Sequence, residues 1–502
     1  MARTERILAI DIGATSIKVG EFEYPDKETV SLIRFAHREY EEELTEASRS
    51  VVVAGLLRQM LMENRFTPKR ALVSISGQSA FTRFVRLPPF AADESRIRQI
   101  VEFEARQNVP FPMNEVIWDY QLIASENEDD MDVLFVVIKN DVVEQMTAAV
   151  QAVGLDPILV DVAPAACFNA ARANHIGEED CVMILNIGGR STNLLFSDGI
   201  RFFARTIPIA GHSITQQIGK EFGIGFAEAE ELKRRHGFVA LGGAYAEPES
   251  EVAAAVSKII RNVMARLHGE INRSISVYRA QQKGNRPVKL YLTGGSSSMT
   301  YTNNFFEEKL RMDVEYLNPF GVVQLGPEIN KQELEAVAHM FSEVIGLGLR
   351  YQFPCPIEVS LVPESIRRQQ VLDRKKPYLI VAAACLVAVL LLLWRGSEFK
   401  ATLIRDSVSQ GERALSQART QMKLLNNAIG EMEGAEAEYD SLRVLLQRRG
   451  FWPGVLNELQ RLKPNDLWLT KIEPIMEEIR AEEDSASDGG GGSDEGGAFG
   501  SG

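Results

Sequence analysis

The sequence predicts an α/β domain followed by a single transmembrane helix and a coiled coil. Three observations support this prediction. Short β-branched runs alternate with helical stretches up to about residue 350, one uncharged apolar run occupies 377–394, and a heptad pattern follows it. The chain has 502 residues, which exceeds one simple domain, so we expect two to four structural units.

Composition excludes several functional classes. Lys and Arg number 55 against 69 Asp and Glu, and the net charge of -14 argues against a nucleic-acid binder. The four cysteines are scattered without a CxxC pair, so neither a disulfide scaffold nor a zinc module is expected. The six histidines form no HExxH cluster, and no GxxxxGK[ST] motif indicates a P-loop nucleotidase.

Before the apolar run, five short segments are rich in β-branched and aliphatic residues. Continuous apolar runs of this length, separated by helical stretches, are typical of buried and largely parallel strands. The segments are ILAIDIG (7–13), ALVSISG (71–77), VLFVVIK (133–139), CVMILNIG (181–188) and VKLYLTGG (288–295).

The first strand leads into a turn with phosphate-binding chemistry. Residues 10–18 read IDIGATSIK, so the strand ends at Asp11, turns at Gly13 and continues with two hydroxyls and Lys18. Backbone N–H groups and hydroxyls in such a hairpin can bond phosphate oxygens, with the lysine as countercharge. A carboxylate at the strand tip can hold hydrated magnesium.

Two later strands end in similar glycine turns. LNIGGRSTNLLF (185–196) places Gly188, Gly189 and two hydroxyls after a strand, and LYLTGGSSS (290–298) does so with a Gly-Gly pair. Glycine at these positions lets another group approach the backbone closely. Each turn alone is more often structural than functional, but three of them in this order are a more specific signal.

The three turns resemble the two phosphate loops and the adenosine loop of the actin-like ATPase superfamily. Residues 5–350 resemble more closely the PilM family of type IV pilus assembly, which is related to the cell-division protein FtsA. The stretches 71–90, 100–123, 133–166 and 207–234 are similar to PilM, the first two to its inserted subdomain. The resemblance implies an actin-like domain over 1–355 with an inserted PilM/FtsA-type subdomain at 78–160.

The resemblance also implies ATP and Mg²⁺ as cofactors and assigns their binding residues. The magnesium residue is Asp11. The residues implied for the first phosphate loop are Gly13, Thr15, Ser16 and Lys18, those for the second are Gly188, Gly189, Ser191 and Thr192, and those for the nucleoside are Glu230, Lys233, Gly294, Gly295 and Ser296.

The second loop departs from the family pattern at Asn186, where an acid is usual. An amide keeps its hydrogen-bonding ability but loses the charge that helps to hold a metal and orient water. Arg190 and Asn193 also replace residues that are usually small and acidic. We therefore expect ATP binding with little or no hydrolysis, assign no catalytic residue, and keep as the alternative an actin fold with a degenerate pocket.

The apolar run 377–394 is long enough to cross a membrane as a helix. Tyr378 and Trp394 lie near its ends, where amphipathic rings favour the headgroup level. A buried core helix would seldom lack a polar stripe over this length. The bias of basic residues places the N-terminal side in the cytoplasm and the C-terminus in the periplasm, and the lack of a signal peptide agrees. The basic residues before the run are Arg367, Arg368, Arg374, Lys375 and Lys376, and those after it are Arg395, Lys400 and Arg405.

The stretch 396–449 carries a heptad pattern. Positions in alternating steps of four and three from Ile404 to Leu446 are mostly apolar or Ala, with interruptions at Gly411, Glu436 and Arg443. The pattern predicts a short coiled coil through which the chain could form a homodimer.

Segments on both sides of the apolar run resemble PilN, the membrane partner of PilM. The juxtamembrane segment 356–376 has a short extended apolar part that could dock by backbone pairing or by filling a groove. Its residues Val359, Leu361 and Pro363 would dock in cis onto the inserted subdomain near 78–123. Residues 450–480 resemble part of the periplasmic PilN module, and the acidic, Gly-rich tail 481–502 is expected to be disordered.

These features predict a fused PilM–PilN assembly-platform protein, or scaffold, of the bacterial inner membrane with other PilN/PilO-like proteins as partners. The alternatives are a GspL-like platform protein of type II secretion and an active actin-like ATPase or filament protein. A sugar or acetate kinase would need a catalytic acid and a substrate pocket, and the sequence indicates neither.

Overall fold

The computed structural model divides into two units, Met1–Val381 and Ala382–Gly502, which are described separately. The predicted tail 481–502 and the end of the predicted module 450–480 lie outside the described residues. The structure describes residues 5–473 except for 42–43, 46, 88–98, 104–105, 108, 110, 124–130, 200, 242–249 and 466.

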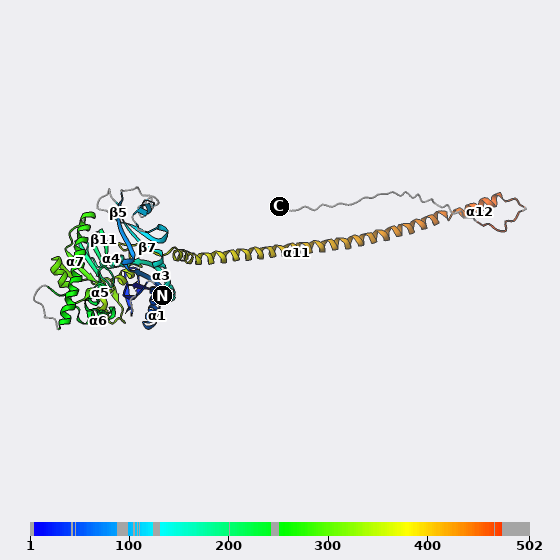
Figure 1. Cartoon of the computed structure of the whole chain (residues 1–502). Helices are drawn as coiled ribbons and strands as arrows, with labels where there is room; N and C mark the ends of the chain where they lie inside the picture. Colours follow the sequence, from blue (N-terminus) through cyan, green and yellow to red (C-terminus); the bar gives the residue numbers. More distant parts are fainter. Residues whose placement is uncertain are drawn as a thin grey trace. The chain divides into compact units, whose positions relative to one another are not determined.

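Two mixed sheets form the centre of the first unit (Figure 1). The first has the order β14-β3-β2-β1-β4-β8 and the second β11-β10-β9-β12-β13. The first sheet contains β1 (Glu5–Ile12), β2 (Ser16–Tyr24), β3 (Ser31–Glu39), β4 (Arg70–Ile75), β8 (Asp156–Val162) and β14 (Gln324–Leu325). The second contains β9 (Val182–Ile187), β10 (Thr192–Asp198), β11 (Arg201–Ile207), β12 (Lys289–Thr293) and β13 (Asp313–Tyr316).

The two sheets repeat one topology. In each, three consecutive strands form an antiparallel meander, and the first strand of the meander then pairs in parallel with a later strand. The sequence predicted largely parallel strands, and the meanders differ from that. Turns as short as 13–15 and 188–191 can connect only antiparallel neighbours, because a parallel connection needs a dozen or more residues.

A third, antiparallel sheet lies between β4 and β8 in the sequence. Its order is β5-β7-β6, with β5 at Ala80–Leu87, β6 at Val116–Ile123 and β7 at Met131–Lys139. Val133, Phe135 and Val137 of β7 are buried, and the Trp118 ring stacks on Phe135 with centroids 5.6 Å apart. The separate sheet lies within the predicted inserted segment 78–160, whereas β8 pairs with β4 in the first sheet.

Helices pack on the sheets, and two of them are central. α4 (Ala163–Ala173) contacts α10 (Ser342–Arg350), and α10 also contacts β1, β2 and β4. α1 packs on α3, and α7 contacts α5, α6 and β11 (Figure 1). The other helices are α1 (Arg49–Glu63), α3 (Asn140–Gln151), α5 (Gly211–Phe222), α6 (Phe226–His236), α7 (Glu251–Gln281), α8 (Thr302–Leu310), α9 (Lys331–Val337) and the short η1 (Gly77–Ser79), η2 (Met113–Glu115), η3 (Gly295–Ser298) and η4 (Ala338–Met340).

α10 is buried along its length because small residues let it approach its neighbours. Every residue from Ser342 to Leu349 is buried. A Cβ atom added to Gly346 would lie 1.8 Å from the carbonyl oxygen of Ala166 in α4, and one added to Gly348 would lie 2.6 Å from the Phe22 ring. The two glycines therefore set the distance between α10 and the surrounding elements.

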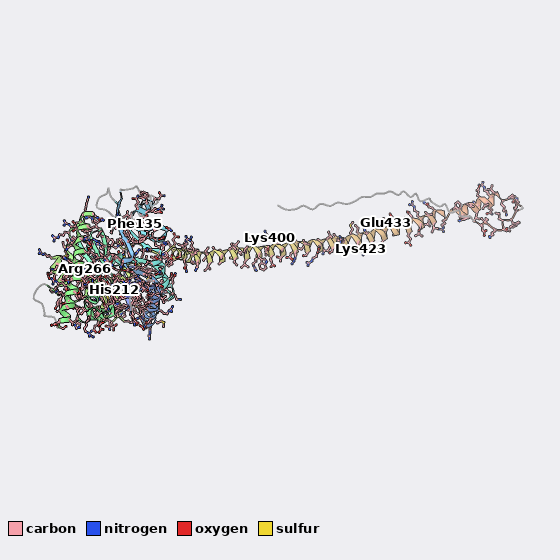
Figure 2. All side chains as sticks on the ribbon, viewed as in Figure 1. Phe135, His212, Arg266, Lys400, Lys423 and Glu433 are labelled. Atoms are coloured by element: carbon pink, nitrogen blue, oxygen red, sulfur yellow. The ribbon has the colours of Figure 1, made fainter. Side chains whose placement is uncertain are left out.

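The predicted membrane span lies within α11 (Glu364–Arg448), which α12 (Phe451–Leu462) follows. Among the described residues, this helical stretch alone is long and apolar enough to cross a membrane, with a mean hydropathy of 2.5 over its most apolar 18 residues. Figure 2 shows Lys400, Lys423 and Glu433 on the part of α11 that follows the apolar run 377–394, where side chains stand out from the helix. The heptad positions lie on this exposed helix, and the coiled coil stays a prediction.

The same substitution at two helical glycines should have opposite effects on stability. Gly346→Ala should lower the free energy of unfolding by about 1–3 kcal/mol, because its Cβ would overlap Ala166. Gly55→Ala in α1, where no atom lies within 4 Å of the added Cβ, should raise it by about 0.5–1 kcal/mol. Chemical denaturation of the full chain measures both, and a Gly346→Ala protein as stable as the wild type would contradict this packing.

Candidate functional site

The β1–β2 hairpin presents a buried ion pair beside a glycine turn. The Gly13 N–H donates to the Ser16 carbonyl over 3.0 Å and closes the turn that contains Thr15. Asp11 and Lys18 face each other across the hairpin, and the Lys18 Nζ donates to Asp11 Oδ2 over 2.7 Å. Burial lowers the pKa of Lys18, but the carboxylates of Asp11 and Glu343 outweigh burial and raise this pKa above its ordinary value. The ammonium therefore stays charged.

The β9–β10 hairpin repeats this geometry and lies against the first turn. Its Gly188 N–H donates to the Ser191 carbonyl over 3.1 Å, and Thr192 Oγ1 donates to the Ile209 carbonyl. A Cβ atom on Gly189 would lie 2.2 Å from Thr15 Cγ2, so the backbone of the second turn touches the first. The structure thus brings the two predicted phosphate loops together.

The third turn packs against the second. Gly294 has a φ of 91°, which favours glycine, and its N–H donates to the His339 carbonyl over 2.7 Å. The hydroxyl of Ser296, the residue after Gly295, donates to the Gly188 carbonyl over 2.9 Å. All three predicted turns therefore lie side by side, and the region where they meet is called the cleft.

Glu230 and Lys233 of α6 form a polar cluster next to the second turn. The Lys233 Nζ lies 2.6 Å from Glu230 Oε2 and 2.9 Å from the Thr215 hydroxyl, which also donates to Glu230. Burial raises the pKa of Glu230, but Lys233 and the other donors outweigh burial and lower it to about 2. The cluster reaches the second turn through Gly211, whose carbonyl faces Lys233 and whose N–H donates to Gly188.

Sequence reasoning missed Glu343, which contacts Asn186 on the strand before the second turn. It lies in the first turn of α10, is 6% exposed, and accepts a hydrogen bond from the Asn186 side-chain nitrogen. Burial and the Asp11 carboxylate raise the pKa of Glu343 to about 7, against the opposing effect of Lys18. The one signal for it in the sequence was an acid within the otherwise apolar or small run FSEVIGLGL (341–349).

Arg190 and Asn193, which also depart from the family pattern of the second loop, are hydrogen-bonded to neighbouring segments. The guanidinium of Arg190 donates to the Leu44 carbonyl over 2.9 Å, and Asn193 accepts a hydrogen bond from the Thr206 hydroxyl over 3.0 Å. These contacts hold the loop to its neighbours, so neither residue is a free group that points into the cleft.

The residues present fit a magnesium nucleotide. Asp11 and Glu343 are oxygen donors, the ligand type that Mg²⁺ prefers, and both act on Lys18. Within the described part of the chain, no three His, Cys, Asp or Glu side chains form a metal site.

The predicted docking segment is buried against β6, β8 and α4 of the same unit, and the surface that these elements present to it is called the groove. Ile357, Val359 and Leu361 are 1%, 1% and 0% exposed, and Pro363 is also buried. Alternate residues of an extended chain point to one side, so this alternation buries one face of the segment. The Leu361 N–H donates to the Val160 carbonyl of β8 over 2.8 Å.

Side chains from β6 and α4 fix the backbone of this segment. Asn169 of α4 accepts from the Ile357 N–H over 3.0 Å and donates to the Ile357 carbonyl over 2.7 Å. Gln121 accepts from the Glu358 N–H, and Asp119 accepts from the Ser360 N–H. The groove thus includes β6, which lies within the predicted surface 78–123, and also β8 and α4, which lie outside it.

The duplicated sheets and the three turns that face one cleft define an actin-like ATPase fold, which confirms the predicted fold class. The family described as type IV pilus assembly protein PilM matches residues 9–352. The chain belongs to this family, as the sequence predicted.

Solved and curated proteins resemble parts of the chain. A solved PilM-PilN type IV pilus biogenesis complex matches with a TM-score of 0.60 and 23% identity, and the match covers 69% of this chain and 99% of that one. Cell division protein FtsA from Agrobacterium fabrum and from Rhizobium radiobacter is 26% identical over 161 residues, or 30% of this chain. That match spans 36% of the length of each of these curated relatives.

Removal of Asn169 should loosen the docked segment. Asn169→Ala leaves the N–H and carbonyl of Ile357 without their partners, at a cost of about 1–3 kcal/mol for each buried group left unsatisfied. Hydrogen exchange of the full chain should show faster exchange across 355–363. Asn304→Ala, at an exposed site of α8, should leave that region unchanged. Equal protection in both variants would show that these bonds do not hold the segment.

Proposed function

We propose that this chain is a membrane-anchored platform protein of type IV pilus assembly that binds ATP with Mg²⁺ and hydrolyses it little or not at all. The observation that carries the proposal is the packing of three glycine turns against one another, the first of which lies beside the buried Asp11–Lys18 pair. A charged lysine and backbone N–H groups in one cleft are the chemistry that phosphate recognition needs.

Each part of the nucleotide has candidate ligands in the cleft. Lys18 supplies the charge for a phosphate, and Gly13, Thr15 and Ser16 supply N–H and hydroxyl groups. The residues of the second turn in the same role are Gly188, Gly189, Ser191 and Thr192. The nucleoside would lie near Gly294, Gly295 and Ser296 and the Glu230–Lys233 cluster, and Asp11 would hold the cation, which neutralises phosphate charge.

The expectation of little hydrolysis rests on Asn186. A water that attacks a phosphate must be oriented and must lose a proton, and a neutral amide can orient water but cannot accept the proton. An active ATPase is the second candidate, because Glu343 places a carboxylate directly beside this amide.

The membrane role rests on α11 and the docked segment. We infer a PilM–PilN-like fusion in the bacterial inner membrane, with the first unit in the cytoplasm and the C-terminal part in the periplasm. It would link cytoplasmic and periplasmic components of the assembly machinery, with PilN- and PilO-like partners and a homodimer through 396–449. The fold match to a PilM-PilN complex and the seated segment 356–363 support a PilN-like interaction in cis.

Nucleotide binding is tested on the full chain in lipid nanodiscs. Lys18→Ala should weaken ATP binding by about 10- to 100-fold, since it removes a charge-assisted bond worth about 1.5–3 kcal/mol. Calorimetry measures the affinity and phosphate release measures turnover. Lys220→Ala, at an exposed position of α5, is the matched control and should bind like the wild type. Rapid turnover by the wild type would overturn the scaffold part of the proposal, and no binding by the wild type would overturn the nucleotide part.

Docking in cis is tested by the placement of charges. Val359→Asp with Leu361→Asp should release the segment and speed protease cleavage within 351–366 several-fold, because buried unpaired carboxylates are costly. Val371→Asp with Leu372→Asp makes the same chemical change at side chains that are 45% and 57% exposed. This control should be cleaved like the wild type, and equal cleavage of all three proteins would contradict docking.

A further inference from the structure

The duplicated topology makes Asn186 the counterpart of Asp11. Each residue precedes the first glycine of its turn by two positions, Gly188 and Gly13 respectively. Each also lies on the strand that pairs in antiparallel with the next strand and in parallel with a later one. Of the two equivalent positions, one therefore carries a carboxylate and the other carries an amide.

A carboxylate from another element, α10, nevertheless contacts the side chain at position 186. Glu343, at the N-terminal end of α10, accepts a hydrogen bond from the Asn186 side-chain nitrogen. The Asn186 oxygen is on the side of Gly294, where an added Cβ would be 2.4 Å from it. The carboxylate of Glu343 therefore lies at the end of the residue 186 side chain, and it interacts electrostatically with Lys18 and Asp11.

Asn186 and Glu343 are chemically complementary. An aspartate at position 186 could not donate to Glu343, and two adjacent carboxylates without a cation would repel each other. An amide at position 186 removes this repulsion and fixes the Glu343 carboxylate in place. The amide is thus what allows an acid to approach from α10.

We propose that Glu343 supplies the carboxylate that the second phosphate loop lacks, and that it binds the divalent cation of the nucleotide together with Asp11. This inference rests on the proposed nucleotide binding. Asp11 bonds Lys18 directly and the charge of Glu343 also acts on Lys18, so two carboxylates are available for the usual Mg²⁺ site, in which one or two carboxylates combine with phosphate oxygens. Glu343 acts here as a cation ligand, and no role in hydrolysis is assigned to it.

The test measures how much Mg²⁺ improves ATP binding by the full chain in nanodiscs. The quantity is the ratio of the dissociation constants in EDTA and in Mg²⁺. Glu343→Gln has nearly the same shape as the wild type, and it should reduce this ratio at least tenfold while binding in EDTA is unchanged or tighter. Glu144→Gln, at an exposed site of α3, should keep the wild-type ratio.

A double variant that exchanges the amide of residue 186 and the carboxylate of residue 343 tests whether the acid has moved from the second loop to α10, which is here called the relocation. Asn186→Asp with Glu343→Gln keeps one carboxylate and one amide at the contact, so it should fold even where a single variant does not. It should restore the ratio of dissociation constants in EDTA and in Mg²⁺, here called the magnesium effect, to within about threefold of the wild type. Electron paramagnetic resonance with Mn²⁺ in place of Mg²⁺ and ADP as the nucleotide should show that the double variant binds the ion. A folded double variant without the magnesium effect would overturn the relocation.

The remaining outcomes separate this inference from the proposed function. If Glu343→Gln weakens binding equally in EDTA and in Mg²⁺, Glu343 supports the fold of the cleft and is not a cation ligand. If the ratio is unchanged in Glu343→Gln, the inference fails while nucleotide binding stands. If the wild type binds no nucleotide in either condition, the proposed function and this inference fail together.

Discussion

The close packing of α10 against α4 is the constraint on which both candidate sites depend. Gly346 brings the axis of α10 so near to α4 that a single methyl group would overlap the Ala166 carbonyl. At one end of α10, Glu343 bonds Asn186 on the strand that leads into the second turn. At the other end, Arg350 forms a buried ion pair with Asp161 of β8, the strand whose Val160 carbonyl binds the docked segment. One rigid helix of nine residues therefore positions residues of the cleft and of the groove.

The repeated sheet topology explains why the three turns meet. One turn follows β1 of the first sheet and two follow β9 and β12 of the second, which are parallel and therefore place their turns at the same end of that sheet. α4 contacts β4 and β8 of the first sheet and β10 of the second, and so holds the two sheets together. Contact between Gly189 and Thr15 then leaves no room for a side chain at position 189. The cleft is thus a product of backbone geometry, and its charge comes from a few side chains, chiefly Asp11, Lys18 and Glu343.

Sequence reasoning could predict the parts of the fold that depend on local pattern. Each strand that ends in a glycine turn is encoded within about ten residues, and so are the apolar run of α11 and the alternation at 357–361. It could not predict Glu343 as the partner of Asn186, since the two are 157 residues apart and neither position carries a local signal for the other. The same holds for Asn169 and Gln121 in the groove, whose partners are 188 and 237 residues away. The antiparallel meanders were missed for a different reason, because apolar runs alone do not encode strand direction.

The docked segment is continuous with α11, so a segment from a separate partner protein could bind the groove only in competition with it. The carbonyl of Pro363 accepts from the Arg367 N–H, so the helix begins where the groove ends, and about 20 Å of helix separates it from the start of the apolar run at Pro377. Because the segment belongs to the same chain as the groove, it competes for the groove at an effective concentration of about millimolar. A second segment of similar chemistry on another chain would have to bind far more tightly, or the cis segment would first have to leave. In the proposed fusion, the link between the first unit and the membrane would therefore be permanent and not recruited.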